Sequence, residues 1–206
     1  MVNGTKSTML GELSEDDDDN PFKILVATIL SQRTRDETSS RAADRLFSIY
    51  NSPTSLAEAD KETIQEVIRP VGFYKVKASR IKEVSRIILE KFNGNVPSNL
   101  EDLLSLPSVG RKTANCVLVY GFGKPAIPVD THVHRVFNRL GVVNTKTPDE
   151  TELDLKNTIS QELWSDLNEY VIRFGKTICK PIGPRCGVCT LNNSCKTYSK
   201  RINSKN

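Results

Sequence analysis

Apolar residues recur at helical spacing along most of this 206-residue chain. The clearest case is residues 21–34, PFKILVATILSQRT, which open with Pro21 and carry a stripe at positions 22, 25, 26, 29 and 30. Similar stripes follow, and short turns such as 51–55 and 93–99 separate them. They fall in 39–50, 60–71, 74–92, 99–106, 129–141 and the long segment 148–179. Strand-like alternation is scarce, so the sequence predicts an all-α fold.

Two prolines in GKPAIPVD, Pro125 and Pro128, mark a predicted crossing between two helical lobes. We expect one lobe over 21–124, and a second over 125–206 joined by 1–20. No run approaches the roughly 18 apolar residues that a membrane-spanning helix needs. Residues 1–20 contain no apolar signal core, so we expect a cytoplasmic protein with no membrane partner. We also expect it to be a monomer.

The net charge of +4 hides an asymmetry. Residues 1–20 hold one lysine against six acids, a net −5, which leaves +9 for the rest of the chain. From Val171 to Asn206 there are eight lysines or arginines and no acid. A basic body with an all-basic tail fits nucleic acid better than a membrane or an acidic small molecule. A merely solvated basic face is the alternative on charge alone.

Four of the five cysteines lie close together near the end of the chain, spaced C-x6-C-x2-C-x5-C: Cys179, Cys186, Cys189 and Cys195. Nothing in the sequence suggests the oxidising compartment that disulfides need. Structural zinc usually shows paired short spacings or cysteine–histidine pairs, whereas four thiolates also suit a 4Fe-4S cluster. The spacing favours the cluster and leaves zinc as the alternative. The fifth, Cys116, lies in an apolar helix and is predicted to be a core residue.

The stretch LPSVGRKTANCVLVYGFG, residues 106–123, places a glycine-bearing turn directly before Arg111, Lys112 and an apolar helix. The backbone N–H groups at such a helix start suit an anion. An ammonium there is disfavoured by the positive end of the helix macrodipole. Lys112 is therefore expected either to be neutralised by phosphate or to act as a neutral amine.

Together these motifs resemble the endonuclease III family, the helix–hairpin–helix DNA glycosylases that also act as lyases. LPSVGRKTAN resembles the family's hairpin, VDTHVHRV its catalytic aspartate segment, and the cysteine spacing its iron–sulfur ligands. The likeness runs from about Pro21 to Cys195. It implies the helix–hairpin–helix DNA glycosylase fold, with a helical barrel lobe and an iron–sulfur cluster lobe.

The resemblance implies a base excision repair enzyme that removes oxidised pyrimidines from double-stranded DNA and nicks the strand by β-elimination. In this interpretation Lys112 attacks the sugar of the damaged nucleotide and forms a Schiff base, and Asp130 stabilises the developing positive charge. The simpler alternatives are a phosphate-binding lysine and a helix-capping aspartate. The predicted cofactor is a 4Fe-4S cluster on Cys179, Cys186, Cys189 and Cys195.

The resemblance also implies residues that bind DNA. The hairpin supplies Leu106, Pro107, Ser108, Val109, Gly110, Arg111 and Thr113. Independently of the resemblance, the positive charges between the first two clustered cysteines predict that their loop presents Lys180 and Arg185 to phosphates. Ser108 stands where the family commonly has glycine.

Phe73, where relatives often have leucine, is the predicted wedge that fills the space left by the extruded base. A second wedge in the family is a glutamine. Ungapped alignment puts Arg33 at that position, with Gln32 beside it.

Two other functions stay open at this point. Mismatch-specific glycosylases share part of the pattern but usually lack a lysine at position 112. A non-catalytic iron–sulfur DNA-binding protein would keep the cysteines and the basic surface without the lyase chemistry. Lys112 favours the lyase.

Overall fold

The computed structural model describes residues 20–203, which form helices and loops with no strand in that range. The all-α prediction is confirmed. The contacts divide the chain into two compact units, with the division between Ala126 and Ile127. This point lies between the two prolines of GKPAIPVD. The predicted placement of residues 1–19 falls outside the described residues.

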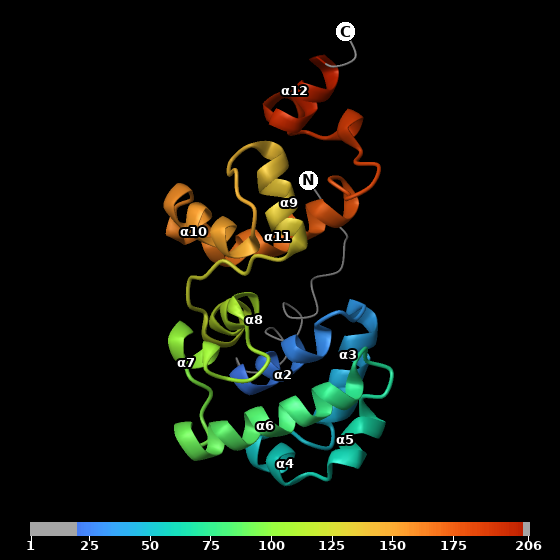
Figure 1. The fold of residues 1–206 in the computed structure, drawn as a ribbon, viewed down its shortest axis with the longest axis vertical. Helices are drawn as coiled ribbons and strands as arrows, with labels where there is room; N and C mark the ends of the chain where they lie inside the picture. The colour runs from blue at the N-terminus through green and yellow to red at the C-terminus, as the bar shows by residue number, and fades with distance from the viewer. Residues whose placement is uncertain (1–19, 204–206) are drawn as a thin grey trace. The chain divides into compact units, whose positions relative to one another are not determined.

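Over residues 20–126, the first unit is built from seven short or medium helices and a π-helical turn (Figure 1). They are α2 (Pro21–Ser31), α3 (Asp36–Phe47), α4 (Pro53–Glu58), α5 (Lys61–Val67), α6 (Tyr74–Phe92), α7 (Leu100–Leu104), α8 (Arg111–Cys116) and the turn η1 (Val117–Gly121).

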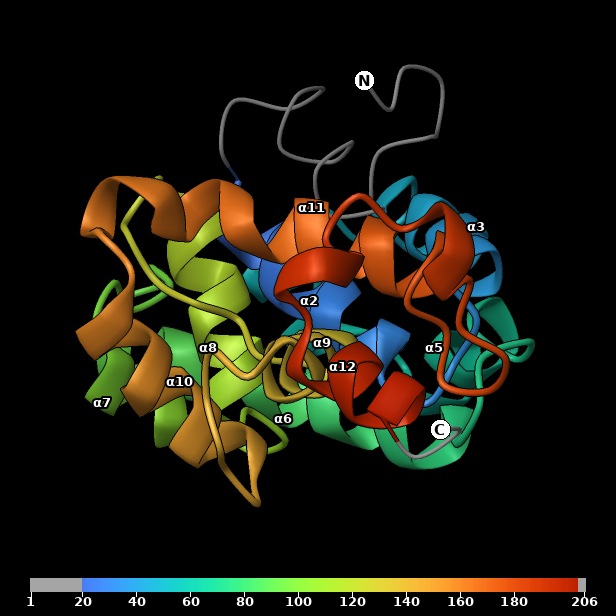
Figure 2. The same cartoon turned by 90° about the horizontal axis from the view of Figure 1, so that it is seen from above.

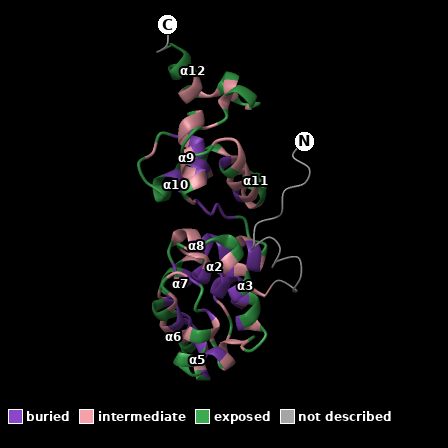
Figure 3. Cartoon of the chain, turned by 90° about the vertical axis from the view of Figure 1, so that its right-hand side faces the viewer, coloured by how far each residue is buried: buried purple, intermediate pink, exposed green. Residues whose placement is uncertain are grey.

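Helix α2 forms the centre of this unit and is buried from residue 24 to residue 30 (Figure 3). Its start follows the sequence prediction, because Asn20 accepts hydrogen bonds from two first-turn N–H groups and Pro21 needs no such partner. Helices α3, α6, α8 and the turn η1 pack around it. A Cβ added at Gly121 would lie 2.9 Å from the Cα of Pro21, so this close approach requires glycine.

One predicted turn is wrong. Residues 51–55, NSPTS, do not simply connect two helices, because α4 begins at Pro53. Ser52 and Ser55 form a reciprocal capping box around that start, and Leu56 is buried against the core. A serine followed by proline indicates a turn and a helix start equally well, and here the buried leucine favours the helix.

The second unit contains α9 (Thr131–Leu140), α10 (Pro148–Thr158) and α11 (Trp164–Thr177), with α9 and α11 packed against each other (Figures 1 and 2). Short 3-10 turns η2 (Gln161–Leu163), η3 (Cys186–Val188) and η4 (Asn192–Ser194) and the helix α12 (Lys196–Asn203) complete it. Its core is small: Ile127, Val129, Val133, Phe137, Val143, Leu155 and Leu167.

The long helical segment expected over 148–179 is interrupted. Backbone at Ile159 is extended and ends α10, and η2 leads into α11. The indole N–H of Trp164 donates to the Ile159 carbonyl at 2.9 Å, so this residue, which packs against the core of the second unit, also closes the corner between α10 and η2. None of the described helices is long and apolar enough to cross a bilayer.

Candidate active site and DNA-binding surface

The predicted hairpin lies between α7 and α8 in the first unit. Leu106 and Val109 are 2% and 6% exposed, so their side chains anchor the turn in the core. Ser108 between them is exposed and adopts a left-handed backbone, with φ of 62°. Only the backbone of Leu106 and Val109 is therefore available for the predicted DNA contact.

Gly110 plays a different part in the turn from the one expected of it. Its backbone is extended, with φ of −94° and ψ of 178°, and a Cβ there would meet nothing within 4 Å. Neither conformation nor packing inside the protein requires glycine at this position. The left-handed residue of the hairpin is Ser108, which carries the strain that a glycine would avoid.

Lys112 is a half-buried residue in the first turn of α8, followed by the buried Thr113. It lies at a helix start, the setting for which the sequence predicts either phosphate binding or a neutral amine.

Asp130 belongs to the second unit, where it is the N-cap of α9. Its Oδ1 accepts hydrogen bonds from the N–H groups of His132 and Val133, both at 2.8 Å. Oδ2 has no hydrogen-bond partner among residues 20–203. The helix-capping interpretation of Asp130 is thus correct for one carboxylate oxygen and leaves the other oriented but unused.

The candidate wedge residues meet on the surface of the first unit. Phe73 is 59% exposed and has a left-handed backbone, with φ of 60°, so it is not a core residue. The guanidinium carbon of Arg33 lies 5.0 Å from the centroid of its ring. Arg33 is itself exposed and left-handed, with φ of 53°. The two side chains form a cation–π pair from loops 40 residues apart.

Gln32 has another role in the structure. Its Nε2 donates to the Ser108 carbonyl at 2.9 Å and to the Thr113 hydroxyl at 3.3 Å. The amide therefore ties the loop after α2 to the hairpin. Of the two candidates for a second wedge, Arg33 is the one whose side chain lies beside Phe73.

Sequence reasoning missed Lys77 of α6, whose side chain is buried and bonded to the loop that carries Arg33. The signal was present in the sequence. Lys77 falls on the same helical stripe as Ile81, Val84 and Ile88, where a lysine is out of place.

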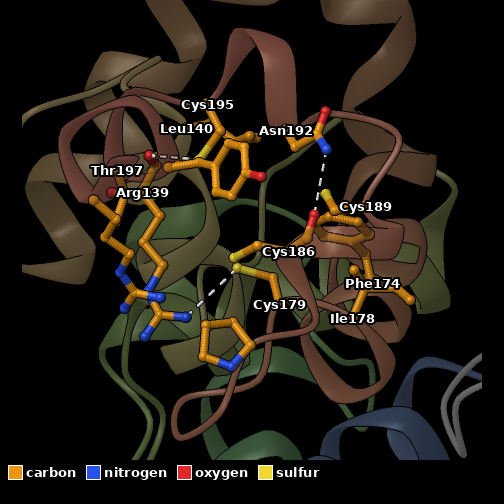
Figure 4. Close-up of a pocket in the computed structure, with 13 residues that line it drawn as sticks. Arg139, Leu140, Phe174, Ile178, Cys179, Cys186, Cys189, Asn192, Cys195 and Thr197 are labelled. Atoms are coloured by element: carbon orange, nitrogen blue, oxygen red, sulfur yellow. Dashed lines mark hydrogen bonds between the residues drawn. The ribbon is translucent and has the colours of Figure 1, made fainter. Parts of the chain in front are cut away.

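The four clustered cysteines line one pocket of the second unit (Figure 4). All four are half-buried thiols, and Cys116, by contrast, is fully buried in the first unit as predicted. Within the described part of the chain, no three such side chains converge closely enough to hold a single metal ion. The donor set suits a cluster, in which each thiolate binds its own iron around a shared centre.

Arg139 of α9 connects the helix to this loop. Its guanidinium donates to the carbonyls of Lys180 and Pro181 at 2.7 and 2.9 Å and approaches Cys179 Sγ at 3.6 Å. Cys195 Sγ lies 3.3 Å from the Arg139 carbonyl. The predicted phosphate contacts Lys180 and Arg185 are both exposed on the same loop.

Comparisons with known proteins agree with this geometry. A family model described as HhH-GPD superfamily base excision DNA repair protein matches residues 26–161. Endonuclease III of Thermotoga maritima is 52% identical over 182 residues, covering 88% of this chain and 85% of its own.

Two solved structures are similar throughout. A non-covalent endonuclease III–DNA complex has a TM-score of 0.84 and 36% identity, covering 94% of each chain. A trapped endonuclease III–DNA covalent intermediate has the same TM-score and identity, covering 94% of this chain and 93% of its own.

The helical fold and the hairpin therefore define a member of the HhH-GPD superfamily of base excision DNA repair proteins. Within that superfamily, the chain belongs to the endonuclease III family.

Proposed function

We propose that this protein is a bifunctional DNA glycosylase and abasic-site lyase that removes oxidised pyrimidines and then nicks the strand. The family to which it belongs consists of base excision repair enzymes with both activities. The observation that carries the proposal is Lys112, a lysine directly after the hairpin in the first turn of α8. The binding partner of the protein is double-stranded DNA containing a damaged base or an abasic site. We also infer a cytoplasmic, nucleoid-associated location.

Lys112 is the proposed nucleophile. Its neutral amine attacks the anomeric carbon of the extruded nucleotide, the damaged base leaves, and an imine forms between Nζ and the opened sugar. Loss of a proton from the adjacent sugar carbon then expels the 3′ phosphate, which nicks the strand. The trapped covalent intermediate of a relative with DNA supports covalent chemistry of this kind.

Asp130 is the proposed electrostatic and proton-transfer partner. The α9 cap orients its carboxylate through Oδ1, which leaves Oδ2 for the cationic sugar or for a proton. Because the cap is made by backbone N–H groups, the carboxylate is oriented without help from another side chain.

The hairpin and the wedge pair are the proposed DNA-binding surface of the first unit. Gly110 is exposed and open on its Cβ side, which lets a phosphate approach the backbone closely. Phe73 would fill the space of the extruded base, and Arg33 would contact the base left without its partner. Both lie on the surface and side by side.

The four cysteines of the second unit are the proposed ligands of a 4Fe-4S cluster, with the spacing of the family's ligands. When bound, the cluster would cross-link the loop through its thiolates. The loop would then hold Lys180 and Arg185 against DNA phosphates.

Borohydride trapping tests the nucleophile. The wild-type protein should nick a duplex containing one oxidised thymine, and borohydride should give a covalent adduct. Lys112→Gln should still bind the duplex and should lose nicking and trapping together, because an amide cannot form the imine. Lys91→Gln, at an exposed position in the last turn of α6, is the matched control and should behave as wild type.

An adduct formed by Lys112→Gln would refute the assignment of the nucleophile. A wild-type protein that acts only on mismatched bases and leaves an intact abasic site would instead be a mismatch glycosylase. Binding without excision or adduct would identify a non-catalytic DNA-binding protein.

A further inference from the structure

Lys77 is buried at 6% exposure in the first unit, and its ammonium has three hydrogen-bond acceptors. Nζ donates to the Leu30 carbonyl at 2.8 Å, to the Gln32 carbonyl at 2.5 Å and to the Thr34 hydroxyl at 3.1 Å. An ammonium carries three N–H donors, so this set of acceptors matches it. A methionine of similar length would fill the same space with none of these bonds.

Burial of this charge is unfavourable, and it lowers the pKa of Lys77 to about 8. The bonds go to carbonyls and a hydroxyl and include no carboxylate, so no opposite charge offsets the desolvation. The buried positions of α6 nearest to Lys77 are apolar: Ala78, Ile81 and Val84. A lysine that only packed in this core would be less favourable than an apolar residue. The hydrogen bonds of Lys77 are therefore the reason for a lysine at this buried position.

These bonds hold the chain on both sides of Arg33, through backbone carbonyls before it and through the Thr34 hydroxyl after it. Leu30 is in the last turn of α2, and Gln32 and Thr34 flank Arg33 directly. Arg33 has a left-handed backbone, which costs an arginine free energy and persists only where its surroundings enforce it. Lys77 provides that enforcement from a neighbouring helix.

The same side chain connects this loop to Phe73. The Thr34 hydroxyl that Lys77 contacts also accepts the Gly72 N–H at 3.2 Å. A Cβ at Gly72 would lie 3.1 Å from the Arg33 carbonyl, so the two loops are in close contact. The backbone N–H of Lys77 donates to the Phe73 carbonyl at 3.0 Å, in the first turn of α6.

We propose that Lys77 is the positioning residue of the Arg33–Phe73 pair. Its ammonium fixes the loop of Arg33 against the start of α6, and so holds guanidinium and ring 5.0 Å apart on the surface. Lys77 is buried beneath the surface that meets the DNA and acts through the two exposed side chains. The inference depends on the proposed glycosylase function, in which Phe73 fills the space of the extruded base and Arg33 contacts the base left without its partner.

The test compares two substrates under single-turnover conditions, a duplex with a paired oxidised pyrimidine and the same duplex with a preformed abasic site. Lys77→Met should slow base excision from the first roughly tenfold or more, because extrusion of a paired base is unfavourable and the Arg33–Phe73 pair would no longer offset that cost. Nicking and borohydride trapping at the abasic site, where no base is extruded, should change little. Lys91→Met is the matched control and should leave both rates unchanged.

The pair of substrates separates positioning from a general effect on folding. A variant that was merely less stable would lose both activities in proportion. The double variant Lys77→Met/Arg33→Ala should lose less excision than the sum of the two single losses, because part of the effect of Lys77 passes through Arg33. Equal losses on the two substrates, or fully additive losses in the double variant, would overturn the proposal.

Two further measurements remain decisive if Lys77→Met folds poorly. Thr34→Val removes one acceptor of Lys77 and the partner of the Gly72 N–H while conserving side-chain shape, and should give a smaller loss with the same substrate selectivity. Amide hydrogen exchange should become faster at Gly72 and unchanged in α4 and α5. The inference would be refuted if the Gly72 amide still exchanged slowly in Thr34→Val. It would also be refuted if Thr34→Val lost activity equally on the paired-base and abasic-site duplexes.

The failure of this inference is distinguishable from that of the proposed function. If the wild-type protein nicks and traps but the Lys77 variants show no selectivity, only the positioning role is wrong. If the wild-type protein forms no adduct with abasic DNA, the lyase and this role are both rejected.

Discussion

At the scale of single residues, four exposed positions in the described part of the first unit adopt left-handed backbone without being glycine: Arg33, Phe73, Asn93 and Ser108. Each such position costs on the order of 1–3 kcal/mol and needs support from its surroundings. The side-chain amide of Gln32 donates to the Ser108 carbonyl and so supports Ser108. The ammonium of Lys77 donates to the Gln32 carbonyl and so supports the loop of Arg33. Arg33, Phe73 and Ser108 belong to the proposed DNA-binding surface, whereas Asn93 is the C-cap of α6.

Ser108→Gly should stabilise the protein. Glycine removes the left-handed strain, about 1–2 kcal/mol, and adds back about 0.5–1 kcal/mol of unfolded-state entropy, so the net gain is about 0.5 kcal/mol. The exposed side chain contributes little packing. Urea denaturation of both proteins measures the change. The matched substitution Gly110→Ala, at an extended position with open space, should be tolerated by the fold. A destabilised Ser108→Gly would show that the strain is smaller than the φ of 62° implies.

At the scale of elements, the start of α9 combines a structural and a proposed chemical role in one carboxylate. Asp130 caps the helix through Oδ1. The preceding Val129 and the later Val133 are buried in the core of the second unit, so the cap has a defined position. A helix start is a rigid place from which to present the second oxygen.

Asp130→Asn and Asp130→Ala should separate these roles. Asparagine caps helices as well as aspartate does, so Asp130→Asn should keep the melting temperature and lose most excision, because the negative charge is gone. Asp130→Ala should lose activity and also about 1 kcal/mol of stability with the cap. Thermal denaturation and excision rates measured on the same preparations test this. Full activity in Asp130→Asn would exclude a role for the charge.

At the scale of the whole molecule, burial is unevenly distributed between the units. The first has a large apolar core around α2. In the second, no residue from 176 to 203 is buried, although this stretch holds the four cysteines. Apolar packing therefore contributes little to holding this stretch together. A bound cluster would supply cross-links where a core is lacking.

Cysteine substitutions should show that the first unit is stabilised by apolar packing and that residues 176–203 are stabilised by a bound cluster. Wild-type protein purified without oxygen should be brown and contain about four irons per chain. Cys186→Ser should lose iron and become sensitive to proteolysis within 176–203. Cys116→Ala, in the core of the first unit, should keep its iron and lose about 1 kcal/mol of stability to a small cavity. If the wild-type protein contained one zinc per chain and no iron, the four cysteines would bind zinc and the cluster assignment would be wrong.

The sequence alone determined the helical class and the start of α2, because both depend on local signals. Asn20 followed by Pro21 and a stripe of apolar residues specifies a helix start wherever it occurs. The position of Lys112 after the hairpin and the spacing of the cysteines are likewise properties of short segments. They led to the family that the comparisons confirmed, while the catalytic roles of Lys112 and Asp130 stay predictions.

Only the tertiary structure decided what depends on contacts between distant segments. Residues 51–55 contain the start of α4 because Leu56 packs into the core. The helical segment 148–179 is interrupted at Ile159, where the Trp164 indole donates a hydrogen bond to the backbone carbonyl. Gln32 and Ser108 are 76 residues apart, so no local pattern distinguishes a glutamine that ties a hairpin from one that enters DNA. Lys77 is the sharpest case. Its proposed positioning role depends on backbone carbonyl groups at the end of another helix. Every residue has a backbone carbonyl, so a sequence does not show which of them accept a hydrogen bond from a lysine.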